Sequence, residues 1–432
     1  MQTTTFDRLE SAVRSYCRAF PVVFTTAQGS RLHDDKGRSY IDFLAGAGSL
    51  NYGHNHPALK EALLDYIAGD QVVHSLDMHT AAKQHFLEVF ERHVLQPRKM
   101  KYVMQFTGPT GTNAVEAALK IARKVTGRRN VIAFTNGFHG VTLGALGCTG
   151  NRHHRGAAGI DPVGVTRMPY DGYLGNGIDS TVYLDKVLTD NSSGVDLPAA
   201  VIVETVQGEG GINAASAGWL RSLQTVCRRH GVLLIVDDIQ AGCGRTGDFF
   251  SFEEAGIRPD IVTLSKSLSG YGLPMAVVLI DPRIDAWQPG EHNGTFRGHN
   301  LAFITAARAI ETFWRDDRLR NEVRLKGDYV GSRLQALAHR CDGFFATGRG
   351  LMRGLHTSGE EFTAAVTRAC FEQGLIIETS GARDQVLKIL CPLTIADDDL
   401  ERGMDILERN VLAQRERMSP RAARIAAGVF RP

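Results

Sequence analysis

Between residues 101 and 279, short apolar runs alternate with segments whose apolar residues recur every three or four positions. The runs are nearly continuous in apolar residues, as strands buried on both faces of a sheet are. The predicted strands span residues 102–106, 130–134, 200–206, 232–236, 261–264 and 275–280. Segments 112–125 and 217–230 are predicted helices, and Gly127 and Gly231 are placed to end them. This alternation predicts an α/β fold with a mostly parallel central sheet.

The pattern changes near residue 318, where a long helix, a glycine-rich stretch, a further helix and a strand near residues 385–390 are predicted. We therefore expect a large ligand-binding domain over residues 58–317 and a smaller α+β domain over residues 318–432. Residues 1–57 are expected to pack with the small domain. A chain of 432 residues, 43% of them hydrophobic, is long enough to bury the cores of both.

Charge and cysteine content exclude several classes of function. The net charge is only +2 with acids and bases interspersed, so nothing favours nucleic acid or a membrane surface as a partner. The seven cysteines are scattered and form no C-x-x-C pair, which argues against a zinc site or a disulfide framework and favours a reducing cytoplasm. The first 15 residues lack an apolar signal core, and no later run approaches membrane-spanning length.

Lys266 lies just after the predicted strand 261–264 and is framed by small residues. A lysine at the end of a buried strand is partly desolvated, and burial favours its neutral, nucleophilic amine. Such an amine can form an imine with a carbonyl cofactor. The alternative is a solvated loop lysine, which is the commoner case for a lysine taken alone.

The loop after the first predicted strand opens directly onto a predicted helix. It reads Thr-Gly-Pro-Thr-Gly-Thr-Asn over residues 107–113 and places Gly111 and Thr112 at the helix start. Free backbone N–H groups and the helix dipole can hold a phosphate at such a position. An ordinary N-terminal capping turn is the alternative.

Two further loops follow predicted strands, where ligands of parallel sheets bind. Phe138 and His139 stand between two glycines, so an aromatic ring could lie against a planar ligand, although core packing of Phe138 is an equal alternative. Glu209 lies in the glycine-rich segment 204–211 and could pair with a substrate-binding cation. A solvated loop carboxylate is the alternative.

Asp237 and Asp238 follow the predicted strand 232–236 as a pair of carboxylates. A buried carboxylate needs a partner, and a protonated ring nitrogen would suit Asp237 because the opposite charge raises the pKa of that nitrogen. A divalent metal is the alternative. It is disfavoured because the glycine-rich loop lacks the G-x-x-x-x-G-K-[ST] pattern, and no metal is expected.

A phosphate, a ring nitrogen and an aldehyde together describe pyridoxal 5'-phosphate (PLP). From residues 51–57 to Pro392, the chain resembles class III (ω-amino acid) aminotransferases of PLP fold type I. Asp237 and Lys266 stand 29 residues apart, as in that family. The resemblance implies a catalytic Lys266 that binds the cofactor and moves protons, with Asp237 on the pyridine nitrogen.

The resemblance also implies the other cofactor contacts. Phe138 and Ile239 would lie on the two faces of the ring, Gln240 would bond its phenolic oxygen, and His139 would lie adjacent. Gly111 and Thr112 would hold the phosphate. Thr295 matches a threonine that reaches the phosphate from a neighbouring subunit, so a homodimer or a dimer of dimers with shared sites is expected. A loop contact within its own chain or simple strand capping is the alternative for Thr295.

Two residues are implied in substrate binding. Glu209 matches a gating glutamate that pairs with a C-terminal arginine for one substrate and releases it for another. In this chain Lys388 stands where that arginine is usual. Lysine is a point charge without the bidentate fork of arginine, so either Lys388 binds the carboxylate differently or another arginine substitutes.

Several local strings are most similar to the branch of the family that aminates L-aspartate 4-semialdehyde with L-glutamate. This implies L-2,4-diaminobutyrate and 2-oxoglutarate as products of a ping-pong reaction, feeding either ectoine or peptide natural products. The strings span residues 14–18, 45–54, 76–78, 106–116 and 263–274. The alternatives are an ornithine or GABA type of transaminase, a PLP-dependent racemase, or a non-catalytic regulator. The intact set of Asp237, Gln240 and Lys266 argues against the regulator.

Overall fold

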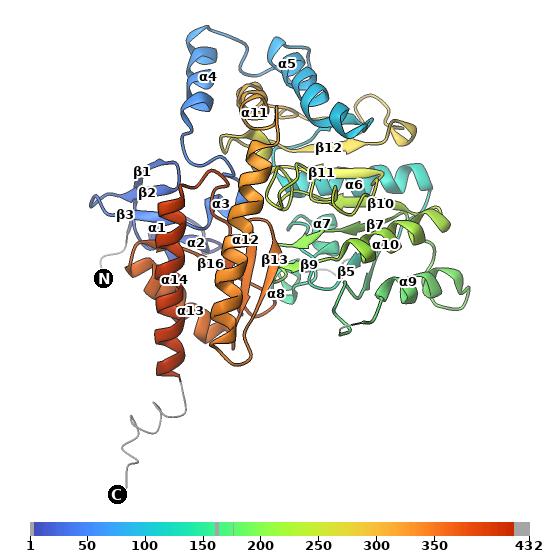
Figure 1. Ribbon diagram of the computed structural model, residues 1–432. Coiled ribbons are helices and arrows are strands. Elements are labelled where there is room, and N and C mark those ends of the chain that lie inside the picture. The colour runs from blue at the N-terminus through green and yellow to red at the C-terminus, as the bar shows by residue number, and fades with distance from the viewer. Residues whose placement is uncertain (1–3, 160–163, 176, 419–432) are drawn as a thin grey trace, which may run out of the picture.

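A seven-stranded sheet holds the strands predicted between residues 101 and 279 (Figure 1). The computed structural model describes residues 4–159, 164–175 and 177–418. Residues 419–432 of the predicted small domain lie outside the described residues. Across the sheet the strands are β4 (Val103–Phe106), β12 (Val277–Ile280), β11 (Ile261–Leu264), β10 (Leu233–Asp237), β7 (Ala200–Val203), β5 (Val131–Phe134) and β6 (Val165–Met168).

The sheet is mostly parallel, which confirms the predicted α/β class. The neighbours β6, β5, β7, β10 and β11 are parallel, and β12 runs antiparallel to both β11 and β4. Edge strand β6 was not predicted, because threonine and arginine interrupt its apolar run and only its last residue is buried. The predicted strand 200–206 is too long, since β7 ends at Val203 and β8 (Val206–Gln207) pairs instead with β9 (Asn213–Ala214).

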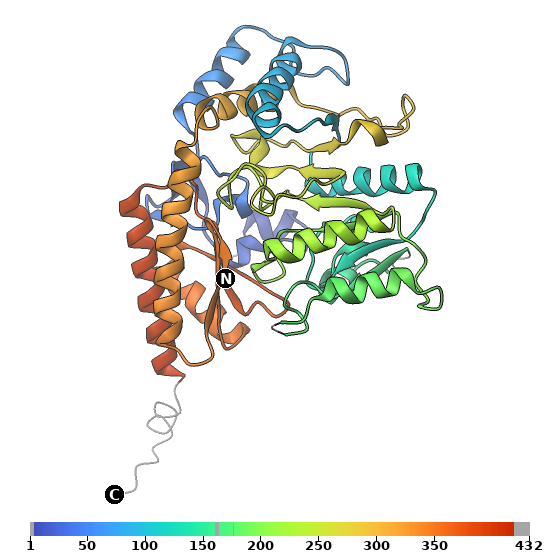
Figure 2. The ribbon, with the colours of Figure 1, turned by 45° about the vertical axis from the view of Figure 1, so that its right-hand side comes forward.

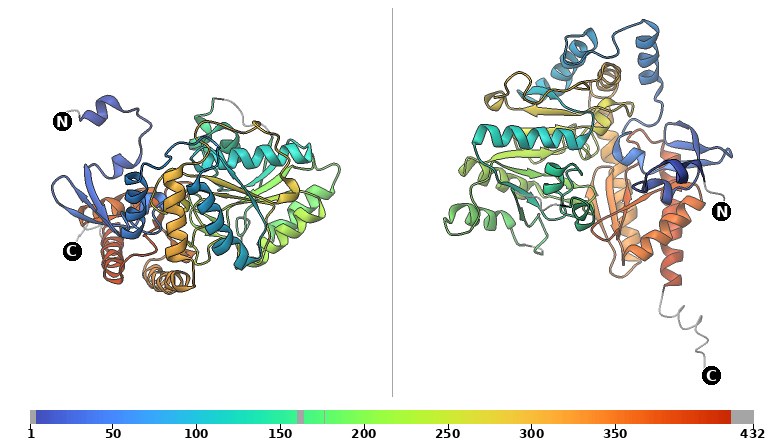
Figure 3. Two further views of the ribbon diagram at one scale, coloured as in Figure 1. Left: turned by 90° about the horizontal axis from the view of Figure 1, so that it is seen from above. Right: turned by 180° about the vertical axis from the view of Figure 1, so that it is seen from behind.

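Helices cover both faces of this sheet, so alternate residues of one strand enter different cores. Leu234 and Val236 of β10 pack in the core that includes α10 (Ala217–Arg229), whereas Ile235 packs in the core that includes α6 (Gly111–Thr126). Helix α10 faces the viewer in Figure 2, and α6 faces the viewer in the right panel of Figure 3. Gly127 ends α6 with φ 66°, as predicted for a left-handed cap.

Further helices precede, connect and follow the strands of the central sheet, and α11 packs against both α4 and α5 at the top of Figure 1. These helices are α3 (Ala45–Gly48), α4 (Pro57–Ala68), α5 (Ala81–Phe90), η1 (Glu91–Leu95), η2 (Gln96–Arg98), α7 (Leu143–Cys148), α8 (Arg152–Gly156), α9 (Ser180–Thr189), η3 (Lys266–Ser269), η4 (Pro282–Ile284) and α11 (Asn300–Phe313). In the described part of the chain, no helix is long and apolar enough to cross a membrane.

The C-terminal region builds an antiparallel sheet flanked by long helices. Its strands, in order, are β13 (Phe345–Arg349), β14 (Met352–His356), β17 (Val386–Ile389) and β16 (Glu378–Ser380). Its helices are α12 (Arg318–His339), α13 (Glu360–Glu372) and α14 (Asp397–Arg417). Helices α12 and α14 run side by side in Figures 1 and 2.

The N-terminal segment shares a sheet with this region. It begins with α1 (Thr5–Leu9) and α2 (Tyr16–Ala19), and its strands are β1 (Phe24–Gln28), β2 (Arg31–Asp34) and β3 (Ser39–Asp42). Strand β3 pairs in parallel with β15 (Leu375–Ile376), where Ile41 faces Leu375. Segments more than 300 residues apart therefore form one sheet. The domain boundaries at residues 57 and 317 stay a prediction.

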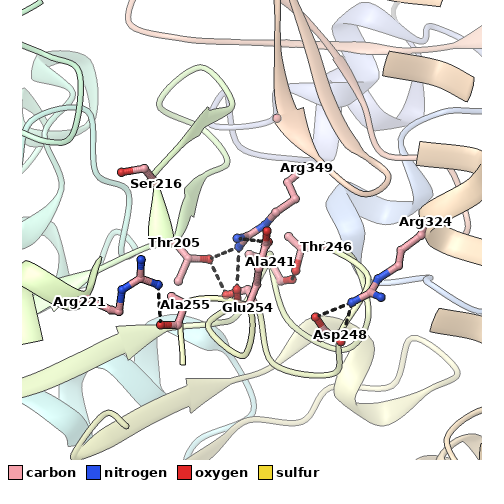
Figure 4. A network of polar contacts seen from close by, with 12 residues as sticks. Thr205, Ser216, Arg221, Ala241, Thr246, Asp248, Glu254, Ala255, Arg324 and Arg349 are labelled. Carbon is pink, nitrogen blue, oxygen red and sulfur yellow. Dashed lines mark hydrogen bonds and ion pairs between the residues drawn. The ribbon is translucent and has the colours of Figure 1, made fainter. Parts of the chain in front are cut away.

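Arg349 of β13 ties the C-terminal region to loops of the central sheet (Figure 4). Its guanidinium donates to the Thr205 hydroxyl at 3.3 Å and to the Ser251 carbonyl at 2.6 Å, and it pairs with Glu254 at 3.0 Å. These loops follow β7 and β10. The small sheet is thus fixed against the strand ends that carry the candidate site.

Arg245 joins three distant parts of the chain from a fully buried position. Its guanidinium donates to the Cys391 carbonyl at 2.5 Å, the Leu351 carbonyl at 3.2 Å and the Asn51 side-chain oxygen at 2.5 Å. These partners are neutral, and burial lowers the pKa of Arg245 to about 10. Its structural contribution therefore lies in satisfying three buried acceptors.

Replacing Arg245 with methionine should destabilise the fold strongly. Methionine fills the volume but leaves the three acceptors unpaired, at about 3 kcal/mol or more in total. Thermal and urea unfolding measure this loss. The matched control is Arg315→Met at an exposed arginine, which should stay within about 0.5 kcal/mol of the parent. Equal losses in the two variants would contradict the role given to the buried guanidinium.

Candidate active site

Lys266 lies where β11 ends, in a backbone conformation that few side chains adopt. Its φ is 51°, in the left-handed region, which costs about 1 kcal/mol or more and is common at functional sites. The Nζ atom donates to the Ala47 carbonyl at 2.9 Å. Burial lowers the pKa of Lys266, although Glu209 opposes the shift. The buried amine is therefore more readily neutral and nucleophilic than a solvated lysine.

Asp237 ends the neighbouring strand β10 and is held by polar contacts on both oxygens. One oxygen lies 2.7 Å from Nδ1 of His139, whose side chain is 1% exposed. The other accepts from the Thr263 hydroxyl at 3.1 Å and the Ile239 amide at 3.2 Å. Burial opposes a charge on His139, but Asp237 outweighs it and raises the pKa of His139. A buried carboxylate is thus positioned at the strand end.

Asp238 bonds to a different set of groups. It accepts from the amide and the hydroxyl of Ser251, and burial raises the pKa of Asp238 to about 7. Ser251 in turn accepts from Thr205, part of the contact group around Arg349 (Figure 4). The two neighbouring carboxylates therefore do not share their protein partners. The predicted role of Asp237 needs no contribution from Asp238.

Glycines let the loops of the site approach each other closely. A Cβ atom at Gly111 would lie 3.0 Å from the Ile239 side chain, and one at Gly140 would overlap Thr112. The Thr112 hydroxyl lies 2.7 Å from the hydroxyl of Thr142. Gly111 and Thr112 begin the 16-residue helix α6. The free amides and dipole of this helix start fit a phosphate group.

Gln240 offers a polar atom that the protein leaves unused. Its amide nitrogen donates to the Ala47 carbonyl at 3.0 Å and to Glu209 at 3.1 Å. Its amide oxygen is buried and has no hydrogen-bond partner in the part of the chain that the structure describes. A buried polar atom of this kind fits a ligand-binding role. Lys266, Asp237, Gln240 and the start of α6 thus suit an aldehyde, a ring nitrogen and a phosphate.

Glu204 holds two loops of the site together, a role that the sequence did not single out. Its oxygens accept from the Phe138 amide at 2.9 Å and the Gly208 amide at 3.2 Å. Burial raises the pKa of Glu204 to about 7. The position of Phe138 therefore depends on Glu204. The segment 204–211 had drawn attention only through its glycines and carboxylates.

Lys388 lies fully buried between two carboxylates. Its Nζ atom is 2.7 Å from Glu209 and 3.0 Å from Glu378, and its side chain is 0% exposed. The sequence predicted Glu209 and Lys388 as substrate residues, and the structure brings them together. Glu378 was not predicted. It faces Lys388 across the pairing of β16 with β17, and such a register is not apparent in sequence.

A cavity of about 350 Å³ lies beside this group of residues. Phe138 and Glu209 line it, together with Arg152 and His154 from α8 and Asp384 from the loop before β17. The His154 ring lies 5.4 Å from the Phe138 ring in an edge-on arrangement. The cavity therefore reaches Phe138, the one predicted cofactor residue in its lining, and the predicted substrate residue Glu209, and it has room for a small amino acid.

Thr295 is separate from these contacts within the chain. It is exposed on the loop between η4 and α11. Among the described residues, no hydrogen bond joins it to the other predicted site residues. Its reach into a neighbouring subunit stays a prediction.

The α/β fold, with Lys266 after β11 and the buried Asp237 at the end of the neighbouring β10, defines a PLP-dependent enzyme of fold type I. Residues 13–411 match the family model described as aminotransferase class-III, and the chain belongs to this family. It is 58% identical to the diaminobutyrate--2-oxoglutarate transaminase of Bordetella parapertussis, over 95% of each chain. The proteins of the same name from Vibrio cholerae and Halomonas elongata are 57% and 58% identical, over 94% of this chain and 99% and 98% of theirs.

Solved structures support the same fold. The ornithine aminotransferase of Toxoplasma gondii is similar with a TM-score of 0.83 and 27% identity, over 95% of this chain and 94% of that one. An S-selective transaminase from Bacillus megaterium has a TM-score of 0.85 at 22% identity, over 95% and 97%. The chain is therefore an aminotransferase that uses PLP, as the sequence predicted.

Proposed function

We propose that this enzyme transfers the amino group of L-glutamate to L-aspartate 4-semialdehyde, giving L-2,4-diaminobutyrate and 2-oxoglutarate. The observation that carries the proposal is the high identity, over nearly the whole chain, to relatives named for that reaction. The buried contact between Glu209 and Lys388 beside Lys266 supports it further, since a lysine next to the reacting amine can receive a substrate carboxylate.

PLP, when bound, supplies an aldehyde for the amino group and a ring that takes up electrons. Lys266 would hold the cofactor and then act as general base, moving the proton of the substrate carbon that bears the amino group. Asp237, oriented by His139, would keep a proton on the ring nitrogen. Each role uses a group that the fold already buries and orients, so little reorganisation is needed.

The remaining residues would orient the cofactor and the substrate. Gly111 and Thr112 would bind the phosphate at the start of α6, and Gln240 would bond the phenolic oxygen. Phe138 and Ile239 would confine the ring between them. Glu209 would release Lys388 when a substrate carboxylate arrives. Lys388 would then bind that carboxylate as a point charge.

We also propose that the enzyme works in the cytoplasm as a homodimer or a dimer of dimers. The exposed position of Thr295 supports a contribution across a subunit interface. Light scattering measures the mass of the assembly. Removal of the Thr295 hydroxyl in Thr295→Val should weaken PLP retention if the neighbouring subunit uses it. The product would enter either ectoine or peptide synthesis.

A half-reaction panel tests the substrates. L-Glutamate first converts the enzyme to its amino form, and 2-oxoglutarate is measured to separate transamination from racemisation. Aspartate, glutamate and succinic semialdehydes are then offered separately. We expect aspartate 4-semialdehyde to restore the original absorbance fastest, by about tenfold or more. A faster return with glutamate or succinic semialdehyde would favour the ornithine or GABA alternative.

A further inference from the structure

Glu378 is a buried carboxyl group for which the mechanism above has no use. It lies 3.0 Å from Nζ of Lys388, which also contacts Glu209 at 2.7 Å. The side chain of Glu378 is 9% exposed, whereas that of Glu209 is 30% exposed and lines the cavity. Lys388 therefore has an inner carboxyl partner on the adjacent strand and an outer one at the substrate side.

The ammonium group of Lys388 has enough N–H donors to contact both glutamates and one further acceptor. An ammonium group has three N–H donors. Lys388 donates one of them to Glu209, whereas its 3.0 Å ion pair with Glu378 leaves Oε1 of Glu378 without a hydrogen-bond partner among the described residues. Glu209 lies on the loop between β8 and β9, outside the strand pairing, whereas Glu378 is fixed opposite Lys388 in the sheet register. Lys388 can thus exchange its outer partner for a substrate carboxylate while Glu378 keeps it in place.

The net charge of Lys388, Glu209 and Glu378 suits the aminated product better than it suits the amino donor. This inference rests on the proposed function. Two ionised glutamates and one lysine carry a net charge of minus one. The amino donor brings two carboxylates and one ammonium group, a net charge of minus one, whereas the aminated product brings two ammonium groups and one carboxylate, a net charge of plus one. An excess of negative charge around Lys388 would repel the donor and attract the product. One proton added to the group removes this excess.

We propose that Glu378 is a specificity-determining residue that positions Lys388 and takes up this proton when a dicarboxylate binds. As a neutral acid, Glu378 leaves Lys388 free to bind the carboxylate of the amino donor. As a carboxylate, it restores the negative charge that suits the product with two amino groups. A single buried acid thereby lets one site accommodate an amino donor and an aminated product of different charge.

The surroundings of Glu378 favour it over Glu209 as the proton acceptor. Burial raises the pKa of Glu378, with Lys388 opposing and Glu209 adding to the shift. Lys266 also opposes the rise in the pKa of Glu378. Tyr16 of α2 faces Glu378 as a neutral hydroxyl, since burial and Glu378 both raise the pKa of Tyr16. Burial acts on Glu209 too, but Lys388 and Lys266 outweigh it and lower the pKa of Glu209.

The test is the binding of glutarate, which has two carboxylates and no amine, to the PLP-loaded enzyme. Calorimetry in buffers of different ionisation enthalpy gives both Kd and the number of protons exchanged. Above the pKa of Glu378, glutarate binding by the parent enzyme should take up as much as one proton, and its Kd should rise up to about tenfold per pH unit. In Glu378→Gln, which is neutral at every pH, this contribution should vanish.

Two variants make the result specific to Glu378. Glu378→Asp keeps a titrating acid and should keep the proton uptake, whereas the exposed Glu401→Gln should behave as the parent enzyme. Equal proton uptake by the parent enzyme and Glu378→Gln at every pH, or loss of uptake in Glu378→Asp, would overturn the proposal. Proton-linked glutarate binding in an enzyme that forms no 2-oxoglutarate from L-glutamate would support it while refuting the proposed donor.

Discussion

Lys266→Ala should abolish transamination, with a fall in kcat of about 10⁴-fold or more. In the proposed mechanism, the variant would lose both the amine that holds the cofactor and the base that moves the substrate proton, and each role alone would contribute about 10²- to 10⁴-fold. The fold should survive, because the Nζ atom of Lys266 donates a single hydrogen bond, to the Ala47 carbonyl. Formation of 2-oxoglutarate from L-glutamate in a single turnover measures the loss directly.

Lys99→Ala is a matched control for this variant. Lys99 is exposed and has φ 52°, so the control also places alanine in a left-handed backbone conformation. It should keep the parent rate and show the same small change in thermal stability as Lys266→Ala. A small primary amine added to Lys266→Ala should restore part of the proton transfer. Near-normal turnover by Lys266→Ala without added amine would refute the assignment.

The central sheet and the placement of Asp237 and Lys266 at one of its edges were predictable from local patterns. Continuous apolar runs indicate strands buried on both faces, and residues after such runs share one edge of a parallel sheet. Asp237 and Lys266 satisfy both conditions, and the pairing of β10 with β11 brings them together, with Asp237 opposite Thr263. Edge strand β6 was not predicted, because one face of an edge strand is less apolar and its polar residues interrupt the apolar run.

Contacts between distant strands were not predictable from one sequence. Glu378 matters only because β16 and β17 pair in a register that sets it opposite Lys388. Shifting that register by one residue would turn Glu378 to the other face. Glu204 likewise has its role through two loops that only the folded chain brings together. Local patterns predict elements, whereas non-local register decides which polar side chains meet.

Asp237→Asn should lower kcat by about 10- to 10³-fold with little change in the shape of the site. Asparagine keeps the size of aspartate but removes the charge that would hold a proton on the ring nitrogen. Loss of a nearby opposite charge lowers the pKa of such a nitrogen. A fall in this pKa of about one to three units corresponds to the expected 10- to 10³-fold fall in kcat. His139 also loses the carboxylate that raises its pKa, so it should become neutral.

The pH dependence of Asp237→Asn separates this electrostatic role from a structural one. Because the ring nitrogen would hold its proton only at lower pH in the variant, kcat should rise as the pH falls, whereas the parent enzyme should change less over the same range. Asp238→Asn is the neighbouring control. It disturbs the bonds to Ser251, so it should lower the thermal midpoint without this pH dependence. If Asp237→Asn instead loses stability and shows the pH profile of the parent, Asp237 acts through packing and its proposed contact with the ring nitrogen is wrong.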